Sequence, residues 1–249
     1  RKFEVGNLFQ LLMLDTRSIY RDKQLNIEDY FDGNSIDKAK YKRHLSVDRK
    51  LIGLEQMLWI KNNLNKKFKW SIIGQQVLMA QVYLPTIFAN MNKKILPDYL
   101  HKYLKIGGAN VPYNTDAWDG YPKERERLFK ELKKANSVLV LTGDTHNSWL
   151  NNLYDENNNF IGVEIGTPAI SSPNTIDTFG SLTDDIEEGF IKENKNVKWT
   201  EGKHKGYTLL KLTKDKSEVS FVYVNTVKSK VYEVIDTNKF NVKPNTPII

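Results

Sequence analysis

The residues best suited to chemistry follow an apolar segment near the middle of the chain. Residues 137–142 (SVLVLT) are typical of a buried strand, and Gly143-Asp144-Thr145-His146 follows at once. Ligands of open α/β sheets gather beyond the carboxyl ends of strands, where a glycine permits a sharp change of chain direction. Carboxylate oxygen and imidazole nitrogen bind hard and borderline cations. The segment therefore indicates metal ligation by Asp144 and His146, although an aspartate at a strand end more often caps a helix.

Two other apolar segments also end in polar side chains. Asp15-Thr16-Arg17 follows residues 9–14 (FQLLML), and Gly74-Gln75-Gln76 lies near the end of residues 70–77 (WSIIGQQV). Each has a simpler interpretation, because an Asp–Arg pair can fix a loop and neutral amides can bond to the backbone. The three strand ends together favour a site, since convergence of polar groups is what a site requires. One rim of the sheet is predicted to collect Asp15, Arg17, Gln75, Gln76, Asp144 and His146.

The elements that must position this rim are read from apolar spacing. Residues 51–64 have a helical pattern, with an apolar face made of Leu51, Leu54, Leu58 or Trp59, and Ile60 as a further candidate. Residues 21–48 are predicted to form a long surface loop. Residues 116–122 (DAWDGYP) are interpreted as a turn into a proline-started helix. The remaining predictions are an extended start at residues 1–5, an irregular insertion at 81–120, helices at 121–132 and 184–194, and strands at 160–165, 207–213, 218–225 and 231–236.

The order of these elements predicts one α/β layered fold with antiparallel edge strands, and strand 9–14 is expected to be buried on both faces. The 249 residues are 40% hydrophobic and 27% charged, which excludes a mainly disordered chain. No apolar run approaches the roughly 20 residues of a membrane-spanning helix. The absence of cysteine excludes disulfides and thiol chemistry. A formal charge of +7 favours anionic partners, but scattered lysine pairs are equally a general sequence bias.

At this point the residues resemble a known family. A series of blocks resembles the C-terminal half of PhoD-type alkaline phosphatases and phosphodiesterases, in the same order and over nearly the whole chain. Because the chain opens without Met, on residues that already have an extended pattern, we interpret it as a fragment or a processed chain. The blocks are residues 13–18 (MLDTRS) with 20–22 (YRD), 53–56 (GLEQ) with Trp59, 70–80 (WSIIGQQVLMA), 116–125 (DAWDGYPKER), 140–149 (VLTGDTHNSW), 163–173 (VEIGTPAISSP) and 204–207 (HKGY).

The resemblance implies a calcineurin-like fold, a layered α/β/β/α sandwich of two mixed sheets with helices outside. Residues 1–249 would form the C-terminal part of one such domain, without its N-terminal strands. It also implies a centre of iron and calcium, with His146 on iron and Asp144 on a neighbouring calcium. Arg17 and Gln75 are the expected catalytic residues, and the family's Gly-Asn-Gln stands here as Gly74-Gln75-Gln76. The implied activity is metal-assisted hydrolysis of phosphate mono- or diesters, with a small-molecule, lipid or nucleotide substrate, in an extracellular or periplasmic protein.

The chain departs from the family in one respect. The family's N-terminal half carries a bridging aspartate, a tyrosine ligand and a block similar to Asp-Asp-His-Glu, and none of these is present. Alone, the chain is therefore expected to bind metal poorly and to turn over little substrate, and the missing N-terminal segment is an expected partner. The alternative is a non-catalytic basic binding module of the same fold. A stable complex with nucleic acid is not expected, because no nucleic-acid-binding motif is present.

Overall fold

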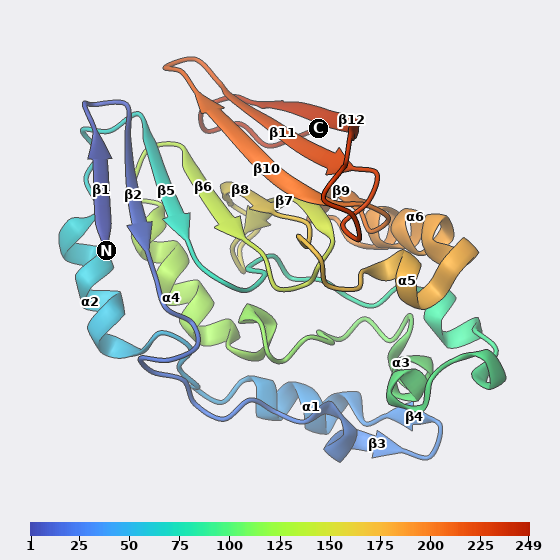
Figure 1. Ribbon diagram of the computed structural model, residues 1–249. Coiled ribbons are helices and arrows are strands. Elements are labelled where there is room, and N and C mark those ends of the chain that lie inside the picture. Colours follow the sequence, from blue (N-terminus) through green and yellow to red (C-terminus); the bar gives the residue numbers. More distant parts are fainter.

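The centre of the molecule is a seven-stranded mixed sheet in the order β1-β2-β5-β6-β8-β7-β9 (Figure 1). The computed structural model describes the backbone of residues 1–249 and every side chain except that of Ile95. Strands β2, β5, β6 and β8 are parallel neighbours, whereas β1, β7 and β9 pair antiparallel at the two sides. The prediction of a mixed α/β fold is confirmed. The strands are β1 (Lys2–Val5), β2 (Phe9–Met13), β5 (Trp70–Gly74), β6 (Val138–Thr142), β7 (Ser148–Tyr154), β8 (Phe160–Gly166) and β9 (Val197–Glu201).

A three-stranded sheet packs on one face of the large sheet. It consists of β10 (Lys205–Leu212), β11 (Ser217–Val224) and β12 (Val234–Val242), and both of its strand pairs are antiparallel. This second sheet is thus not mixed, contrary to what the resemblance implied. Apolar side chains of the two sheets form a shared core, with Leu139 of β6 and Phe221 of β11 both fully buried.

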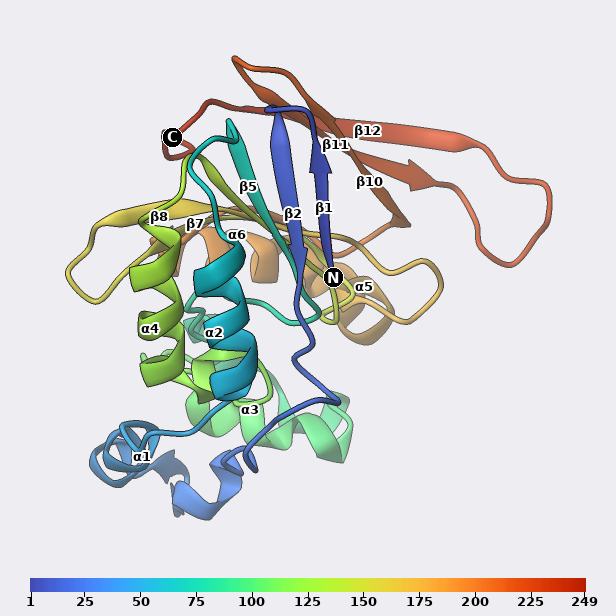
Figure 2. The ribbon, with the colours of Figure 1, turned by 90° about the vertical axis from the view of Figure 1, so that its left-hand side faces the viewer.

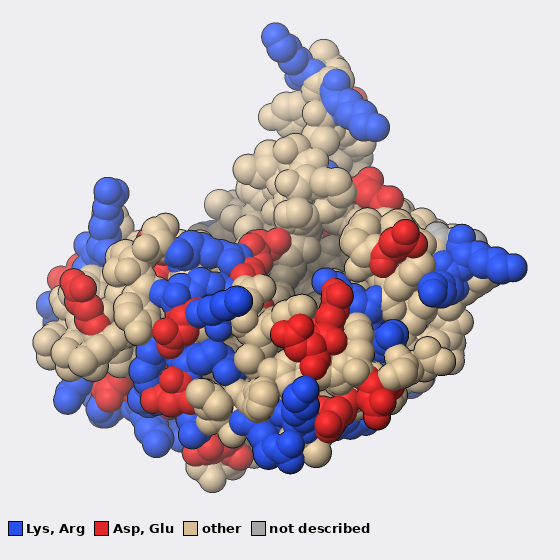
Figure 3. Space-filling model, turned by 90° about the horizontal axis from the view of Figure 1, so that it is seen from below, with Lys and Arg blue, Asp and Glu red and all other residues tan. Residues whose placement is uncertain are grey.

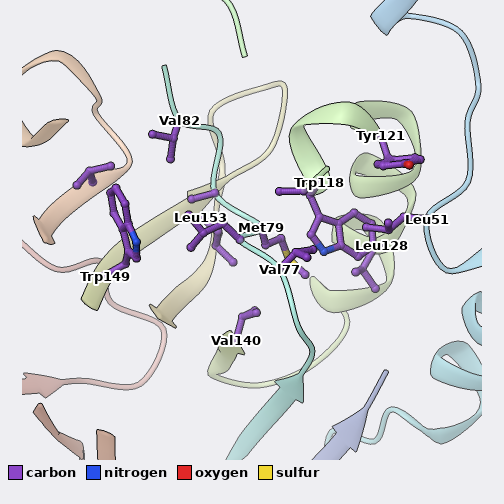
Figure 4. Close-up of a cluster of buried hydrophobic side chains, with 14 of the residues drawn as sticks. Leu51, Val77, Met79, Val82, Trp118, Tyr121, Leu128, Val140, Trp149 and Leu153 are labelled. Atoms are coloured by element: carbon purple, nitrogen blue, oxygen red, sulfur yellow. The ribbon is translucent and has the colours of Figure 1, made fainter. Parts of the chain in front are cut away.

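Helices cover the opposite face of the large sheet. Figure 2 shows α2 (Gly53–Asn63) and α4 (Pro122–Leu132) side by side below the strands, and α6 (Thr183–Glu193) contributes to the same core. Trp118 is one of two buried tryptophans in this core and lies near Val77 and Leu128 (Figure 4). Its 0% exposure means that truncation to alanine would cost about 3–5 kcal/mol.

A further layer of short elements lies beneath these helices (Figure 1). The segment 21–48 was predicted to be a surface loop, and this prediction is wrong in part, because residues 38–45 form a helix that buries Tyr41 and Leu45. Asp37 caps this helix by accepting a hydrogen bond from the Lys40 amide (2.9 Å). The remaining elements are β3 (Phe31–Asp32), β4 (Ser35–Ile36), α1 (Lys38–Leu45), α3 (His101–Ile106), α5 (Thr175–Phe179) and short 3-10 turns.

The buried face of α2 agrees only in part with the predicted one, because Ile60 is buried as predicted but two of the leucines are not. Leu54 is 70% exposed and Leu58 is 47% exposed, whereas Gln56 and Ile60 are buried. The phase of the helix is set by a polar contact, because the Gln56 amide donates to Ile52 O and to Asp15 O. Apolar spacing could not reveal that a glutamine occupies the inward position.

The start of α2 is held by a carboxylate from another helix. Glu124 of α4 accepts hydrogen bonds from the amides of Leu51, Ile52 (3.0 Å) and Gly53 (3.1 Å), and its side chain is 1% exposed. The first amides of a helix have no partner within the helix, and negative charge is favoured at that end. Glu124 therefore joins α2 and α4 where both approach the rim of the sheet.

Among the described residues, no helix is both long enough and apolar enough to cross a membrane.

Candidate metal and phosphate site

The carboxyl ends of three parallel strands place their loops side by side. Beyond β2 and β5 the chains remain paired, with Leu14 N donating to Gly74 O (2.8 Å). Beyond β5 and β6, Gln75 N donates to Leu141 O (3.0 Å) and Gly143 N to Gln76 O (3.1 Å). The loops that follow β2, β5 and β6 therefore form one rim.

Arg17 lies at this rim between two carboxylates. Its Nη1 donates to Asp116 (2.6 Å) and its Nη2 to Asp144 (2.7 Å). Partial burial opposes ionisation, but the hydrogen bonds and charges of the two aspartates raise the pKa of Arg17 above its ordinary value. Asp116 also accepts a hydrogen bond from Arg21 (2.5 Å). A cation held in this way presents a fixed planar group to an anionic ligand.

The loop after β6 has an unusual backbone conformation. Asp144 and His146 both have positive φ, at 73° and 68°, and the Thr145 amide donates back to Gly143 O (2.9 Å). Positive φ is uncommon outside glycine but is enriched in Asp, Asn and His. Gly143 admits the tight turn that precedes these residues. The backbone therefore departs from regular strand geometry at both Asp144 and His146.

One hydrogen bond determines which nitrogen of His146 is available. Nδ1 lies 2.7 Å from the carbonyl oxygen of Pro173, in the loop after β8. A carbonyl can only accept, so Nδ1 carries the proton and Nε2 keeps its lone pair. Metal-binding histidines are commonly oriented by such a contact on the other nitrogen. His146 therefore fits a metal ligand through Nε2.

Asp144 fits the role of a metal ligand less completely than His146 does. Its side chain is 34% exposed, and Oδ1 accepts the hydrogen bond from Arg17. Among the described side chains, no group of three or more His, Asp or Glu residues could hold a metal ion. The chain thus offers two ligands of the right chemistry but not a complete coordination sphere.

The other predicted rim residues are used structurally. Gln75 is turned inward, where its Oε1 accepts from Trp118 Nε1 (3.1 Å) and its amide donates to Val77 O. Gln76 Oε1 accepts from both the amide (2.8 Å) and the hydroxyl (2.7 Å) of Thr16. Asp15 accepts from the amides of Arg17 and Ser18, which lowers the pKa of its carboxyl. Only Arg17 and Asp144, of the six residues predicted to converge, are in direct side-chain contact.

Two cavities meet at Asp144. The polar cleft has a volume of about 610 Å³ and is lined by polar and charged residues that include Asp144. The apolar trough has a volume of about 660 Å³ and lies between the two sheets, with Arg17 and Asp144 at one end. The polar cleft is lined among others by Lys23, Asn26, Lys102, Asn114, Thr145 and Asp116, and the apolar trough by Leu11, Met13, Leu141, Ile165 and Leu210.

Sequence reasoning underestimated Asp116. The segment that contains it was interpreted as a turn, and Asp116 instead pairs with both Arg17 and Arg21. Its 99-residue separation from Arg17 leaves no local pattern from which the contact could be found. The one available signal was the resemblance of residues 116–125 to a family block.

The net positive charge is not gathered on the face that carries α1. Figure 3 shows basic side chains there interspersed with acidic ones. Asp48, for example, accepts hydrogen bonds from both Lys50 (2.5 Å) and Arg127 (2.6 Å). The scattered lysines of the sequence are therefore largely a solvated surface on this side.

Comparisons with known proteins establish the family of the chain. Alkaline phosphatase D of Bacillus subtilis (strain 168) is 33% identical over 221 residues, which are 86% of this chain and 32% of that protein. A solved structure titled "Structure of PhoD" matches 98% of this chain and 41% of its own, with a TM-score of 0.69 and 27% identity. The chain thus spans about a third of the length of the curated relative. The profile of the PhoD-like phosphatases matches residues 1–221, and the chain belongs to that family.

Proposed function

We propose that the chain contributes part of a metal centre that hydrolyses phosphate mono- or diesters. The observation that carries this proposal is the ion pair of Arg17 with Asp144, held at the strand ends beside His146. An immobilised guanidinium next to metal-type ligands combines the two means by which proteins bind phosphate. Membership of the PhoD-like phosphatases supports the same reaction class.

Each residue has a proposed role. His146 binds iron through Nε2, and Asp144 binds a neighbouring calcium, with the metal identities taken from the family. Arg17 donates to the phosphoryl oxygens, and Asp116 keeps its guanidinium in place. When bound, the metals polarise the phosphoryl oxygens and lower the pKa of a coordinated water. Contact between Gln75 and phosphate stays a prediction. In the structure the Gln75 side chain is hydrogen-bonded to Trp118 and Val77 instead.

The complete centre requires further ligands, and we propose that a second segment of the kind present in the longer relatives supplies them. Such a segment would cover the apolar trough, where Met13 is 42% exposed beside Arg17. It would also complete an α/β/β/α sandwich, of which residues 1–249 are one part. By the same family analogy, we propose an extracellular or periplasmic location.

The ligand assignment is tested with Mn²⁺ as a paramagnetic probe in NMR. Weak binding, with broadening confined to resonances of residues 143–146 and their neighbours, is expected for a site with two protein ligands. Asp144→Asn and His146→Ala should each abolish the broadening, whereas His44→Ala, on helix α1, should not. Broadening that is unaffected by either site substitution would reject Asp144 and His146 as ligands.

The activity is tested with 4-nitrophenyl phosphate and bis(4-nitrophenyl) phosphate. The chain is assayed alone and after mixing with the N-terminal half of a PhoD-like relative, with iron and calcium supplied. Turnover that depends on mixing and on His146 supports the proposal. Absence of turnover in every mixture, despite a stable complex between the two segments, would favour the non-catalytic binding module.

A further inference from the structure

A small cavity lined by aromatic rings lies behind the metal-ligand loop. It has a volume of about 120 Å³ and touches Thr145, the residue between Asp144 and His146. An engineered apolar cavity of about 150 Å³ in another protein holds benzene, so this somewhat smaller space comes close to the size of one aromatic ring. We call it the aromatic cage, and its rings are Phe88, Tyr103, Tyr113, Trp149, Phe179 and Phe190.

The rings of the aromatic cage pack edge to face rather than stacking flat. Phe88 makes T-shaped contacts with Tyr103 (5.9 Å between centroids) and with Phe179 (5.5 Å), and Trp149 does so with Phe190 (5.2 Å). This is the preferred geometry of aromatic pairs. A planar guest can therefore add the same type of contact.

Away from the tyrosine hydroxyls, polar side-chain groups at the wall of the aromatic cage already have partners. Trp149 Nε1 donates to the Thr145 hydroxyl (2.8 Å), and Asn147 bonds to the Thr175 hydroxyl (2.7 Å). These groups make no unmet demand on a guest. The cage is thus suited to an apolar planar group rather than to a sugar or a second phosphate.

The aromatic cage and the polar cleft share a wall. Tyr103, Tyr113 and Thr145 line both spaces, and the polar cleft extends from there to Asp116 and Asp144. Both tyrosines are half-buried, so their rings stand at the boundary. The two spaces are therefore adjacent at Thr145, next to Asp144.

We propose that the aromatic cage is a subsite for the leaving group, and that it binds a phosphate ester whose alcohol carries an aromatic ring. The phosphoryl group lies in the adjoining polar cleft, where Lys23 and Lys102 supply cations. The proposal that the ligand's aromatic ring belongs to the leaving group rests on the proposed phosphoesterase function. Binding of the ring itself does not.

The inference is tested by ligand binding to the metal-free chain, followed through the NMR methyl signals of Leu84 and Ile186, which line the aromatic cage. Phenol and phenyl phosphate should shift these signals through ring currents, and glycerol 2-phosphate should not. Phenyl phosphate should bind about tenfold more tightly than glycerol 2-phosphate, the effect of about one well-packed ring. Adenosine 5′-monophosphate distinguishes a nucleobase from a simple aryl group, since it competes with phenol only if a base fits the cage.

Two variants and one control complete the test. Ile186→Phe fills the aromatic cage and should reduce the preference for phenyl phosphate to below about twofold, with binding of glycerol 2-phosphate unchanged. Ile191→Phe adds the same ring to an exposed position of α6 and should change neither. Tyr103→Leu, at the cage boundary, should weaken phenol binding if Ile186→Phe does not fold.

The results separate this inference from the proposed function. Binding of phenol in the cage, with no hydrolysis in any metal-supplied mixture with the N-terminal half of a relative, would support the subsite for the ring and count against the phosphoesterase. Equal affinities for phenyl and glycerol phosphates, or a preference that survives both Ile186→Phe and Tyr103→Leu, would overturn the inference even if hydrolysis is observed.

Discussion

The Nδ1 atom of His146 lies 2.7 Å from the carbonyl oxygen of Pro173. We therefore predict that the neutral ring carries its proton on Nδ1, which long-range ¹H–¹⁵N NMR spectra can establish. Pro173→Ala should leave this tautomer unchanged, because the acceptor is the backbone carbonyl oxygen of residue 173. A proton found on Nε2 would argue against metal binding through that nitrogen.

Replacement of Arg17 by alanine should change metal and phosphate binding in opposite directions. Asp144 loses its competing cation, so its affinity for Mn²⁺ should rise by about threefold to tenfold. Binding of inorganic phosphate should weaken, and Arg17→Lys should be intermediate, because lysine lacks the planar fork. Both affinities are measured by isothermal titration, with Arg43→Ala on α1 as the control. A parallel loss of both affinities would indicate a damaged loop instead.

Stability should fall as pH rises from about 4.5 to about 7 because of Glu164. Burial raises the pKa of this carboxyl from 4.5 to about 7, against hydrogen bonds from Asn151, Met79 and Ala80 that lower it. Below pH 4.5 the carboxyl is protonated in both states, and between there and pH 7 only the unfolded state releases its proton. The loss should total about 3 kcal/mol.

Urea titrations at several pH values measure this effect. Glu164→Gln should flatten the decline between pH 4.5 and 7, and Glu233→Gln, at an exposed position, should retain it. Equal slopes in wild type and Glu164→Gln would show that another group causes the pH dependence.

Glu124→Gln should destabilise the fold by about 2–4 kcal/mol. The side chain is buried and accepts from three amides at the start of α2, and a neutral amide cannot replace a carboxylate there. Glu55→Gln, on the exposed side of the first turn of α2, should cost less than about 0.5 kcal/mol. Similar unfolding midpoints for the two variants would contradict the capping role.

The sequence predicted elements well where apolar residues are continuous. Strand β6 and helix α4 agree with predicted boundaries within about one residue, because both are bounded by clear signals, the start of an apolar run and Pro122. Strand β7 was not predicted. It buries Asn151 and Asn152 completely, and Asn151 donates to Glu164 (2.9 Å), so no apolar period marks it.

Burial on both faces was predicted for strand β2 and is wrong for one face. Leu12 is fully buried, but Met13 is exposed at the apolar trough, where the three-stranded sheet does not cover it.

The proximity of Arg17 to Asp144 followed from the shared strand ends. The aromatic cage did not, because its rings come from segments between residues 88 and 190 with no common spacing.

Because Asp144 and His146 have positive φ values, their loop is strained, and the free-energy cost of that strain falls in folding and not in cation binding. A left-handed residue other than glycine costs about 1–3 kcal/mol, and in this loop the cost is met during folding by the sheet and the Pro173 contact. A cation that arrives later finds the two side chains already arranged. Its affinity is then limited by the number of ligands and not by the entropy of ordering the loop.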